Sequence, residues 1–279
     1  LGFAVETSAL GYVVTPPYWR PDVAVPDDVI EDIGRIYGYD KLPATTLRGA
    51  LPEPEVRPVP DLRERVRDLA AALGCQEIIT YTLTDDVHLQ RVVEPADSRR
   101  TGPLSVVNPV AARHQLLRTS LRANVLETYA ANRRQVDGPL RLYEVGFEYL
   151  PVESDLPHER PVLCGALGGT REGRWQRATG EALDFYDAKG LVESLLASLG
   201  VAPSFQPVTA FGLLPGHTAE VVAAREPLGV IGQVHPGTAA SFDIDEPVFL
   251  FELWLESLVR VLPERPAYAP PSRLPEVRQ

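Results

Sequence analysis

Four carboxylates near the start of the chain have a spacing that could hold a cation. Asp28, Glu31 and Asp32 fall within one arc of roughly 100° on a predicted helix. Asp22 lies on the preceding segment and could fold back onto them. Clustered carboxylates repel one another unless a cation or a basic group of a partner lies among them, and their hard oxygen atoms suit Mg²⁺ or Ca²⁺. The alternative is a solvated helix face whose acidic residues lie favourably near the helix N-terminus.

The other chemically versatile residues show no site pattern. The histidines form neither an HxxxH nor an HExxH pattern, so we expect structural or surface roles for His88, His114, His158, His217 and His235. Cys75 and Cys164 have no CxxC spacing, which argues against a zinc site and for reduced, structural thiols. The sequence also lacks P-loop, dinucleotide-binding and hydrolase nucleophile motifs.

The overall charge and hydropathy exclude broad classes of function. The 279 residues include 38 Asp plus Glu against 27 Lys plus Arg, a formal net charge of −11. An acidic chain binds polyanions poorly, so any nucleic acid would be held by a local patch or by partner subunits. No apolar run approaches the ~20 residues that cross a bilayer, and no secretory signal is visible, which favours a cytosolic protein. The chain has no Met and begins at Leu1 within a predicted strand, so we expect a piece of a longer protein.

A proline-rich stretch divides the chain. Residues 51–60 contain four prolines, and proline removes a backbone donor and fixes φ, so we expect neither a helix nor a central strand there. The predicted divisions are residues 1–46, a Pro-rich linker at 47–60, and a large domain at 61–279.

Local patterns predict a mixture of helices and strands. The predicted helices are residues 28–37 (N-cap Asp27, ended by Gly38), 61–73 (opened by Asp61 and Glu64), 120–134 (capped by Thr119 or Ser120) and 187–199 (ended by Gly200). The predicted strands are 11–17, 77–83, 140–150, 161–168, a hairpin of 220–224 with 229–234, and 247–255. The order lacks regular βαβ alternation, which favours the α+β class with an antiparallel sheet.

Two strings in the first part closely resemble a known family. Residues 17–22 (PYWRPD) and 28–43 (DVIEDIGRIYGYDKLP) resemble the long, specific signature of the bacterial phenylalanyl-tRNA synthetase beta subunit family. The likeness covers nearly the whole chain and continues at residues 74–81, 108–109, 117–121, 141–146, 184–190, 215–219 and 235–236.

The resemblance implies a fold for each part of the chain. Residues 1–46 would be the C-terminal part of a small winged-helix-like domain. Residues 61–279 would form a noncatalytic core of the α+β class, with a class II aminoacyl-tRNA synthetase-like antiparallel sheet flanked by helices.

The resemblance also favours the cation over the solvated helix face. In the family, Mg²⁺ is bound at the positions matching Asp22, Asp28, Glu31 and Asp32, in a site shared with the alpha subunit. ATP and phenylalanine would be bound by the alpha subunit rather than by this chain. The full assembly would be a cytoplasmic heterotetramer of two alpha and two beta subunits that charges tRNA(Phe).

The strand at 140–150 departs from the pattern of a catalytic class II strand. Catalytic strands carry R-x-E, so that both side chains project to one side and the Arg can stabilise charge on the α-phosphate. Here Arg141 and Glu144 are three positions apart and fall on opposite faces. The Arg-rich third motif of class II enzymes is not evident either, so we assign no catalytic residue.

The favoured interpretation is a noncatalytic beta-subunit fragment of phenylalanine-tRNA ligase. Its helix at 61–73 and strand at 77–83 would pack against the alpha subunit. Two alternatives remain open, a stand-alone class II-like adenylating enzyme and a nucleic-acid-binding module at residues 1–46. Residues 1–60 carry nine acidic against five basic side chains, which argues against nucleic-acid binding.

Overall fold

The computed structural model describes residues 1–53, 55, 57–97, 99, 102–152, 156–171 and 180–263. The chain divides into two compact units, residues 1–55 and 56–279, and the boundary falls within the proline-rich stretch. The end of the predicted large domain, residues 264–279, lies outside the described residues. No helix in the described part of the chain is long and apolar enough to cross a membrane.

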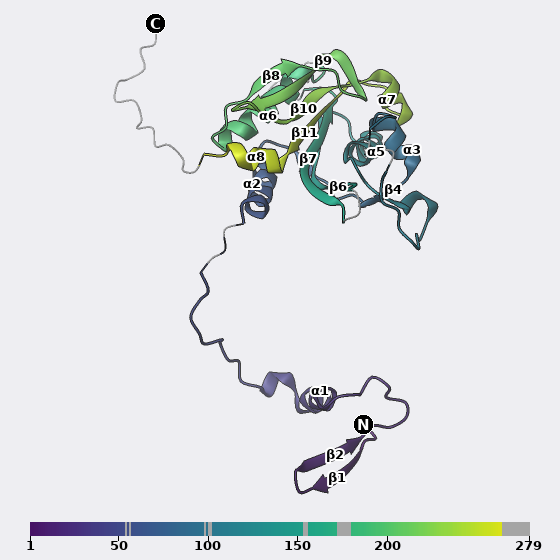
Figure 1. The fold of residues 1–279 in the computed structure, drawn as a ribbon, viewed down its shortest axis with the longest axis vertical. Helices are drawn as coiled ribbons and strands as arrows, with labels where there is room; N and C mark the ends of the chain where they lie inside the picture. Colours follow the sequence, from purple (N-terminus) through teal and green to yellow (C-terminus); the bar gives the residue numbers. More distant parts are fainter. Residues whose placement is uncertain are drawn as a thin grey trace, which may run out of the picture. The chain divides into compact units, whose positions relative to one another are not determined.

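The first unit consists of a hairpin followed by a helix (Figure 1). Strands β1 (Ala4–Ser8) and β2 (Gly11–Thr15) pair antiparallel. Helix α1 (Pro26–Tyr37) and a short 3-10 helix, η1 (Tyr39–Lys41), follow.

Helix α1 begins earlier than its sequence pattern predicts, so the prediction of Asp27 as N-cap is wrong. Val25 occupies the N-cap position and Pro26 is the first helical residue, where a missing N–H costs nothing because the first turn has no intrahelical acceptors. Asp28 instead reaches back, and its Oδ2 accepts hydrogen bonds from the amides of Ala24 (2.7 Å) and Val25 (2.9 Å). The helix ends at Gly38 as predicted, with a positive φ of 100°.

Most apolar side chains of the first unit are exposed. Among its described residues only Val23 and Asp32 are buried. The hairpin and α1 enclose an apolar groove of about 680 Å³, lined by Leu1, Phe3, Val5, Tyr12, Val14, Val29, Asp32, Ile33, Ile36 and Tyr37. The amphipathic helix pattern therefore predicts the apolar face correctly, but little of the unit as described covers that face.

Seven strands form the main sheet of the second unit, in the order β3-β6-β7-β11-β10-β9-β8. Their bounds are β3 Gln76–Glu77, β6 Leu140–Leu150, β7 His158–Gly168, β8 Ser204–Pro207, β9 Leu213–Ala223, β10 Glu226–Val234 and β11 Val248–Trp254. The neighbouring strands are antiparallel except β3 and β6, which are parallel. The prediction of an antiparallel sheet is corrected to a mixed one, because the chain crosses over through two helices between β3 and β6 and returns in the same direction.

The strand predicted at residues 77–83 is wrong as a single element. The Ile78 amide donates to the Tyr143 carbonyl at the sheet edge (2.8 Å), and the chain then leaves the main sheet. Strand β4 (Leu83–Thr84) pairs with β5 (Leu116–Leu117) in a separate two-stranded sheet. An apolar run cannot itself specify that its two ends pair with different partners, since that choice is made by distant segments.

Helices cover both faces of the main sheet (Figure 1). Helices α2 (Pro58–Ala72), α6 (Phe185–Ser198) and α8 (Leu255–Val261) pack on one face, in a core that includes Leu62, Leu195 and Leu258. On the other face lie α3 (Asp86–Val92), α5 (Arg122–Arg133) and α7 (Pro236–Ser241), in a core that includes Leu89, Tyr129 and Ala239. A 3-10 helix, η2 (Ala112–His114), precedes β5.

Helix α2 extends into the predicted linker. It begins at Pro58 rather than Asp61, with Arg57 at the N-cap position, so the box predicted from Asp61 and Glu64 is not the helix start. The expectation that residues 51–60 exclude a helix is therefore wrong at their end. Proline fits the first helical turn, where φ near −65° is required and the amide has no intrahelical partner.

Two other helix starts also differ from prediction by a few residues. Helix α5 has Leu121 at its N-cap position, whereas Ser120 Oγ accepts a hydrogen bond from the Arg122 amide (3.3 Å). Helix α6 is capped by Asp184, which accepts from the amides of Tyr186 (2.8 Å) and Asp187 (3.2 Å). Side-chain oxygen atoms cap helices by satisfying the first free amides, and several nearby candidates compete for each role.

Candidate functional site

The predicted acidic cluster surrounds Arg20, a residue outside the predicted site. The Arg20 Nη2 atom lies 2.7 Å from Asp22 Oδ2, and Nη1 lies 2.7 Å from Asp32 Oδ2. Arg35 Nη2 approaches the other oxygen of Asp32 at 2.6 Å. Asp32 is buried, so its charge is compensated by two guanidinium groups rather than by solvent.

The four predicted ligands therefore have different surroundings. Hydrogen bonding to Arg20 lowers the pKa of Asp22, and hydrogen bonding to Arg35 and Arg20 lowers the pKa of Asp32. The amides at the start of α1 lower the pKa of Asp28. Glu31 is exposed and forms no hydrogen bond or ion pair with another described residue.

The donor atoms suit a hard cation, but they do not converge in this arrangement. Across the described residues, no group of three or more His, Cys, Asp or Glu side chains is placed to hold a metal ion. Arg20 instead joins two of the four carboxylates, in the position that a cation would take. A metal would fit these oxygen atoms only after Arg20 moves.

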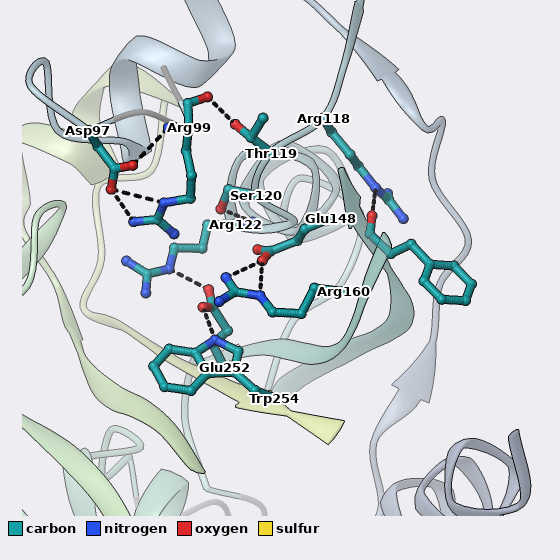
Figure 2. A network of polar contacts seen from close by, with 11 residues as sticks. Asp97, Arg99, Arg118, Thr119, Ser120, Arg122, Glu148, Arg160, Glu252 and Trp254 are labelled. Carbon is teal, nitrogen blue, oxygen red and sulfur yellow. Dashed lines mark hydrogen bonds and ion pairs between the residues drawn. The ribbon is translucent and has the colours of Figure 1, made fainter. Parts of the chain in front are cut away.

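A second polar cluster is buried in the larger unit, on the sheet face that carries α5. Strand register aligns Glu144 on β6, Cys164 on β7 and Glu252 on β11 in one row across the sheet. Glu148 and Arg160 are paired in a parallel row. Figure 2 shows the side chains around Glu148 and Glu252 pointing toward one another above the central strands.

Glu252 is held by two donors. The Arg122 Nε atom donates to Glu252 Oε2 at 2.6 Å, and Trp254 Nε1 donates to Oε1 at 3.1 Å (Figure 2). Arg122 also donates through Nη1 to the Phe211 carbonyl at 3.3 Å. Although burial of Glu252 raises its pKa, the attraction and hydrogen bond of Arg122 outweigh that effect and lower it, so Glu252 is ionised.

Glu148 is the opposite case. Arg160 donates to Glu148 Oε2 through Nε at 3.1 Å and through Nη2 at 2.5 Å, while Oε1 has no hydrogen-bond partner among the described residues. Burial, followed by repulsion from Glu252, raises the pKa of Glu148 to about 7. One acid of the pair is thus held ionised while the other binds a proton near neutrality.

Arg118 completes the cluster. Its Nη2 atom lies 2.8 Å from Glu144 Oε1, its Nε donates to the Phe147 carbonyl at 3.0 Å, and its Nη1 donates to Thr80 Oγ1 at 2.8 Å. The Thr80 hydroxyl in turn donates to Glu144 Oε2 at 2.6 Å. Every polar group of this corner is satisfied, as buried polar groups must be.

The cluster is electrically balanced. A fourth guanidinium, that of Arg99, is paired with Asp97 at 2.7 Å, and Thr119 Oγ1 donates to the Arg99 carbonyl at 2.6 Å (Figure 2). The four basic groups Arg99, Arg118, Arg122 and Arg160 are matched by Asp97, Glu144, Glu148 and Glu252. Each guanidinium is engaged by a carboxylate of this chain, so none is available to an incoming phosphate.

Sequence reasoning located only part of this cluster. It placed Arg141 and Glu144 on opposite faces, and the structure agrees, because Glu144 faces Arg118 while Arg141 lies near Gly74 on the other side. Its partners come from segments up to about 130 positions apart, such as Arg122 and Glu252. The available signal was an acid inside an apolar run, as at Glu252, which implies a buried partner without identifying it.

An exposed apolar surface borders the sheet edge. Its members are Ile79, Tyr81, Val107 and Val110, which expose between 73% and 99% of their area. A cavity of about 450 Å³ beside it is lined by Ile79, Tyr81, Ala111, His114 and Asn124, among others, and the rings of Tyr81 and His114 lie 4.9 Å apart. The outer positions of α2 are polar or small by contrast, namely Glu64, Arg65, Asp68 and Ala71.

Comparisons with known proteins agree with the two-unit division. The phenylalanyl tRNA synthetase beta chain CLM domain matches residues 42–255, and the tRNA synthetase B5 domain matches residues 1–39.

Curated relatives carry one name. A phenylalanine-tRNA ligase beta subunit of Dehalococcoides mccartyi strain CBDB1 is 38% identical over 267 residues, which are 95% of this chain and 32% of the relative. The beta subunits of Hahella chejuensis and Vibrio vulnificus strain YJ016 are 33% and 34% identical, over 100% and 95% of this chain and 34% and 33% of the relatives.

The chain thus spans about a third of the length of these relatives. Because the CLM domain match covers most of its residues, the chain belongs to the phenylalanyl-tRNA synthetase beta chain family.

Proposed function

We propose that the chain is part of a noncatalytic beta subunit of phenylalanine-tRNA ligase. In this role it supports the ATP-dependent attachment of phenylalanine to tRNA(Phe) through structural contacts with an alpha subunit. The observation that carries the proposal is the balanced, buried cluster on the sheet face of a chain whose relatives are named beta subunits. Adenylate chemistry needs basic groups free to stabilise charge on a phosphate, and here the guanidinium groups are held by carboxylates of the chain.

The fold supports the same role. The seven-stranded, mostly antiparallel sheet with helices on both faces is consistent with a class II synthetase-like core at residues 61–279. The hairpin and helix of residues 1–46 are consistent with the C-terminal part of a winged-helix-like domain. ATP would be bound by the alpha subunit, in a cytoplasmic heterotetramer of two alpha and two beta subunits.

The exposed apolar surface is the proposed contact with the alpha subunit. The sequence favoured the helix at 61–73 and the strand at 77–83, but the described outer side of α2 is polar. Ile79 and Tyr81 follow β3, and their exposure is costly in water unless a partner covers them. We therefore place the centre of the contact at the end of β3 rather than on α2.

Co-purification with the alpha subunit tests this proposal. The charged variants Ile79→Asp and Val110→Asp are expected to weaken the complex on size-exclusion chromatography by at least tenfold, on the order of the cost of a central interface residue. The matched control is Val208→Asp, which follows β8 at the opposite edge of the sheet. Equal complex formation by all three variants would exclude this surface.

A catalytic assay separates this proposal from a stand-alone adenylating enzyme. Phenylalanine-dependent pyrophosphate exchange is expected to be absent with the chain alone and present when the alpha subunit is added. Exchange by the chain alone would overturn the noncatalytic assignment.

The acidic cluster is proposed as a Mg²⁺ site shared with the alpha subunit. Asp22, Asp28, Glu31 and Asp32 would supply carboxylate oxygens, and the metal would neutralise charge at the contact between the subunits. The exposure of Asp22 and Glu31 supports a site that a partner completes. Calorimetric titration of Mg²⁺ into the complex and into its Glu31→Gln variant tests it, with weaker binding expected for the variant.

A further inference from the structure

Arg20 has the contacts of a cation bound among carboxylates. Its Nε atom lies 3.0 Å from both oxygen atoms of Asp22, its Nη2 lies 2.7 Å from Asp22 Oδ2, and its Nη1 donates to Asp32 Oδ2 at 2.7 Å. A planar guanidinium binds carboxylates through several parallel hydrogen bonds, which makes such a pair strong and directional. Arg20 therefore bridges two of the proposed metal ligands.

The remaining ligand atoms are partly engaged as well. Arg35 Nη2 binds Asp32 Oδ1 at 2.6 Å, so both oxygen atoms of Asp32 are paired. Asp28 uses Oδ2 to accept from two backbone amides. Of the four carboxylates, Glu31 alone has no hydrogen bond or ion pair within the described part of the chain.

A divalent cation and Arg20 cannot share these oxygen atoms. Mg²⁺ requires oxygen ligands at about 2.0 to 2.1 Å in near-octahedral geometry, whereas the guanidinium holds Asp22 and Asp32 at hydrogen-bond distance around itself. A second positive charge at the same place would also be repelled by Arg20. The two cations are therefore alternatives at one position.

We propose that Arg20 is a built-in counter-ion that competes with Mg²⁺ for Asp22 and Asp32. With Arg20 in place the cluster is neutralised and the segment before α1 is tied to the helix. The metal enters when Arg20 leaves, so Arg20 sets the affinity of the site. This inference rests on the Mg²⁺ site proposed above and concerns only what this chain does toward it.

Isothermal titration of MgCl₂ into the 279-residue chain and its variants tests the competition. Arg20→Gln removes the bridging charge and is expected to bind Mg²⁺ at least about tenfold more tightly than the unaltered chain, an effect of order one charge pair. The matched control is Arg35→Gln, because Arg35 touches Asp32 but not Asp22. Its affinity is expected to stay within about threefold of the unaltered chain.

The outcomes separate the two proposals. If the unaltered chain and Arg20→Gln bind Mg²⁺ equally, the competition is wrong and the metal site stands. If neither binds Mg²⁺, both proposals are wrong for this chain. Amide NMR signals of Ala24 and Val25 report whether the start of α1 is intact, since both amides bond to Asp28. Should Arg20→Gln disturb them, Arg20→Lys decides, because lysine keeps the charge but lacks the fork and is expected to give intermediate affinity.

Discussion

Arg118 lies directly over Gly146, so that a β-carbon at residue 146 would come 2.4 Å from Arg118 Nη2 and 2.9 Å from Glu144 Oε1. The absence of a side chain on β6 is thus what admits a buried guanidinium to the sheet face. The pair of Arg118 and Glu144 is almost fully buried, with 4% and 5% of the side chains exposed.

The first prediction concerns this glycine. Gly146→Ala is expected to displace Arg118 and leave Glu144 without its charge partner, lowering the free energy of unfolding by about 3 kcal/mol in urea titrations. The control is Gly190→Ala on α6, where a β-carbon meets no atom within 4 Å. There the helix preference of alanine is expected to stabilise the protein by ~0.5 to 1 kcal/mol. Similar losses in both variants would contradict the steric argument.

The second prediction concerns pH. Burial raises the pKa of Glu148 from 4.5 to about 7, so the folded state binds a proton that the unfolded state has already lost. Ionising Glu148 therefore reduces stability as pH rises from about 5 to 8, by on the order of 3 kcal/mol. Glu148→Gln removes this titration, so the free energy of unfolding should change less between pH 5 and pH 8.

The control for Glu148 is an ordinary surface acid. Glu193→Gln on α6, where Glu193 pairs with Lys189, should retain the pH dependence of the unaltered chain. Glu252 does not interfere in this window, because its pKa is lowered and it contributes stability that is lost only below its usual range. An unchanged pH profile in Glu148→Gln would show that Glu148 is ionised throughout.

The third prediction concerns the buried ion pair of Arg122 and Glu252. Glu252→Gln leaves the Arg122 guanidinium buried without its counter-charge and should cost about 3 to 5 kcal/mol of unfolding free energy. Arg122→Met together with Glu252→Gln should recover part of that loss, since neither charge is then buried alone. The exposed pair of Arg134 and Asp243 is the control, and Asp243→Asn should cost less than about 0.5 kcal/mol. Additive losses in the double variant would deny the coupling.

The fourth prediction concerns the two thiols. Burial raises the pKa of Cys75 to about 11 and that of Cys164 well above its ordinary value. Because the thiolate is the reactive form, neither cysteine should react with a disulfide reagent such as DTNB at pH 8 in the folded protein. Both should react after denaturation in guanidinium chloride. Rapid reaction of one thiol in the folded protein would show that its surroundings open readily.

Several elements could be predicted because their signals are local. The helices near 28–37, 61–73, 120–134 and 187–199 are all present, since helical periodicity depends on neighbouring residues. Their starts differ by a few residues, most clearly at Pro26 and Pro58, because proline reads as a breaker in sequence but fits a first turn. The strand at 77–83 was predicted as one element because its two pairing partners lie far along the chain.

The acidic cluster could be located but not interpreted from spacing. Periodicity places Asp28, Glu31 and Asp32 together, whereas the contact of Arg20 with Asp32 depends on the turn that brings the preceding segment back to α1. The buried cluster in the larger unit was less predictable still, since its charges come from β6, β7, β11, α5 and the loop around Arg99.

The amino-acid sequence by itself determined the family, the α+β class and most elements, because signatures, periodicity and turn residues are carried by short stretches of chain. Only the tertiary structure decided which charges are paired. A buried charge is stable only beside a counter-charge, and the partners of Asp32, Glu148 and Glu252 are chosen by folding rather than by their neighbours in sequence.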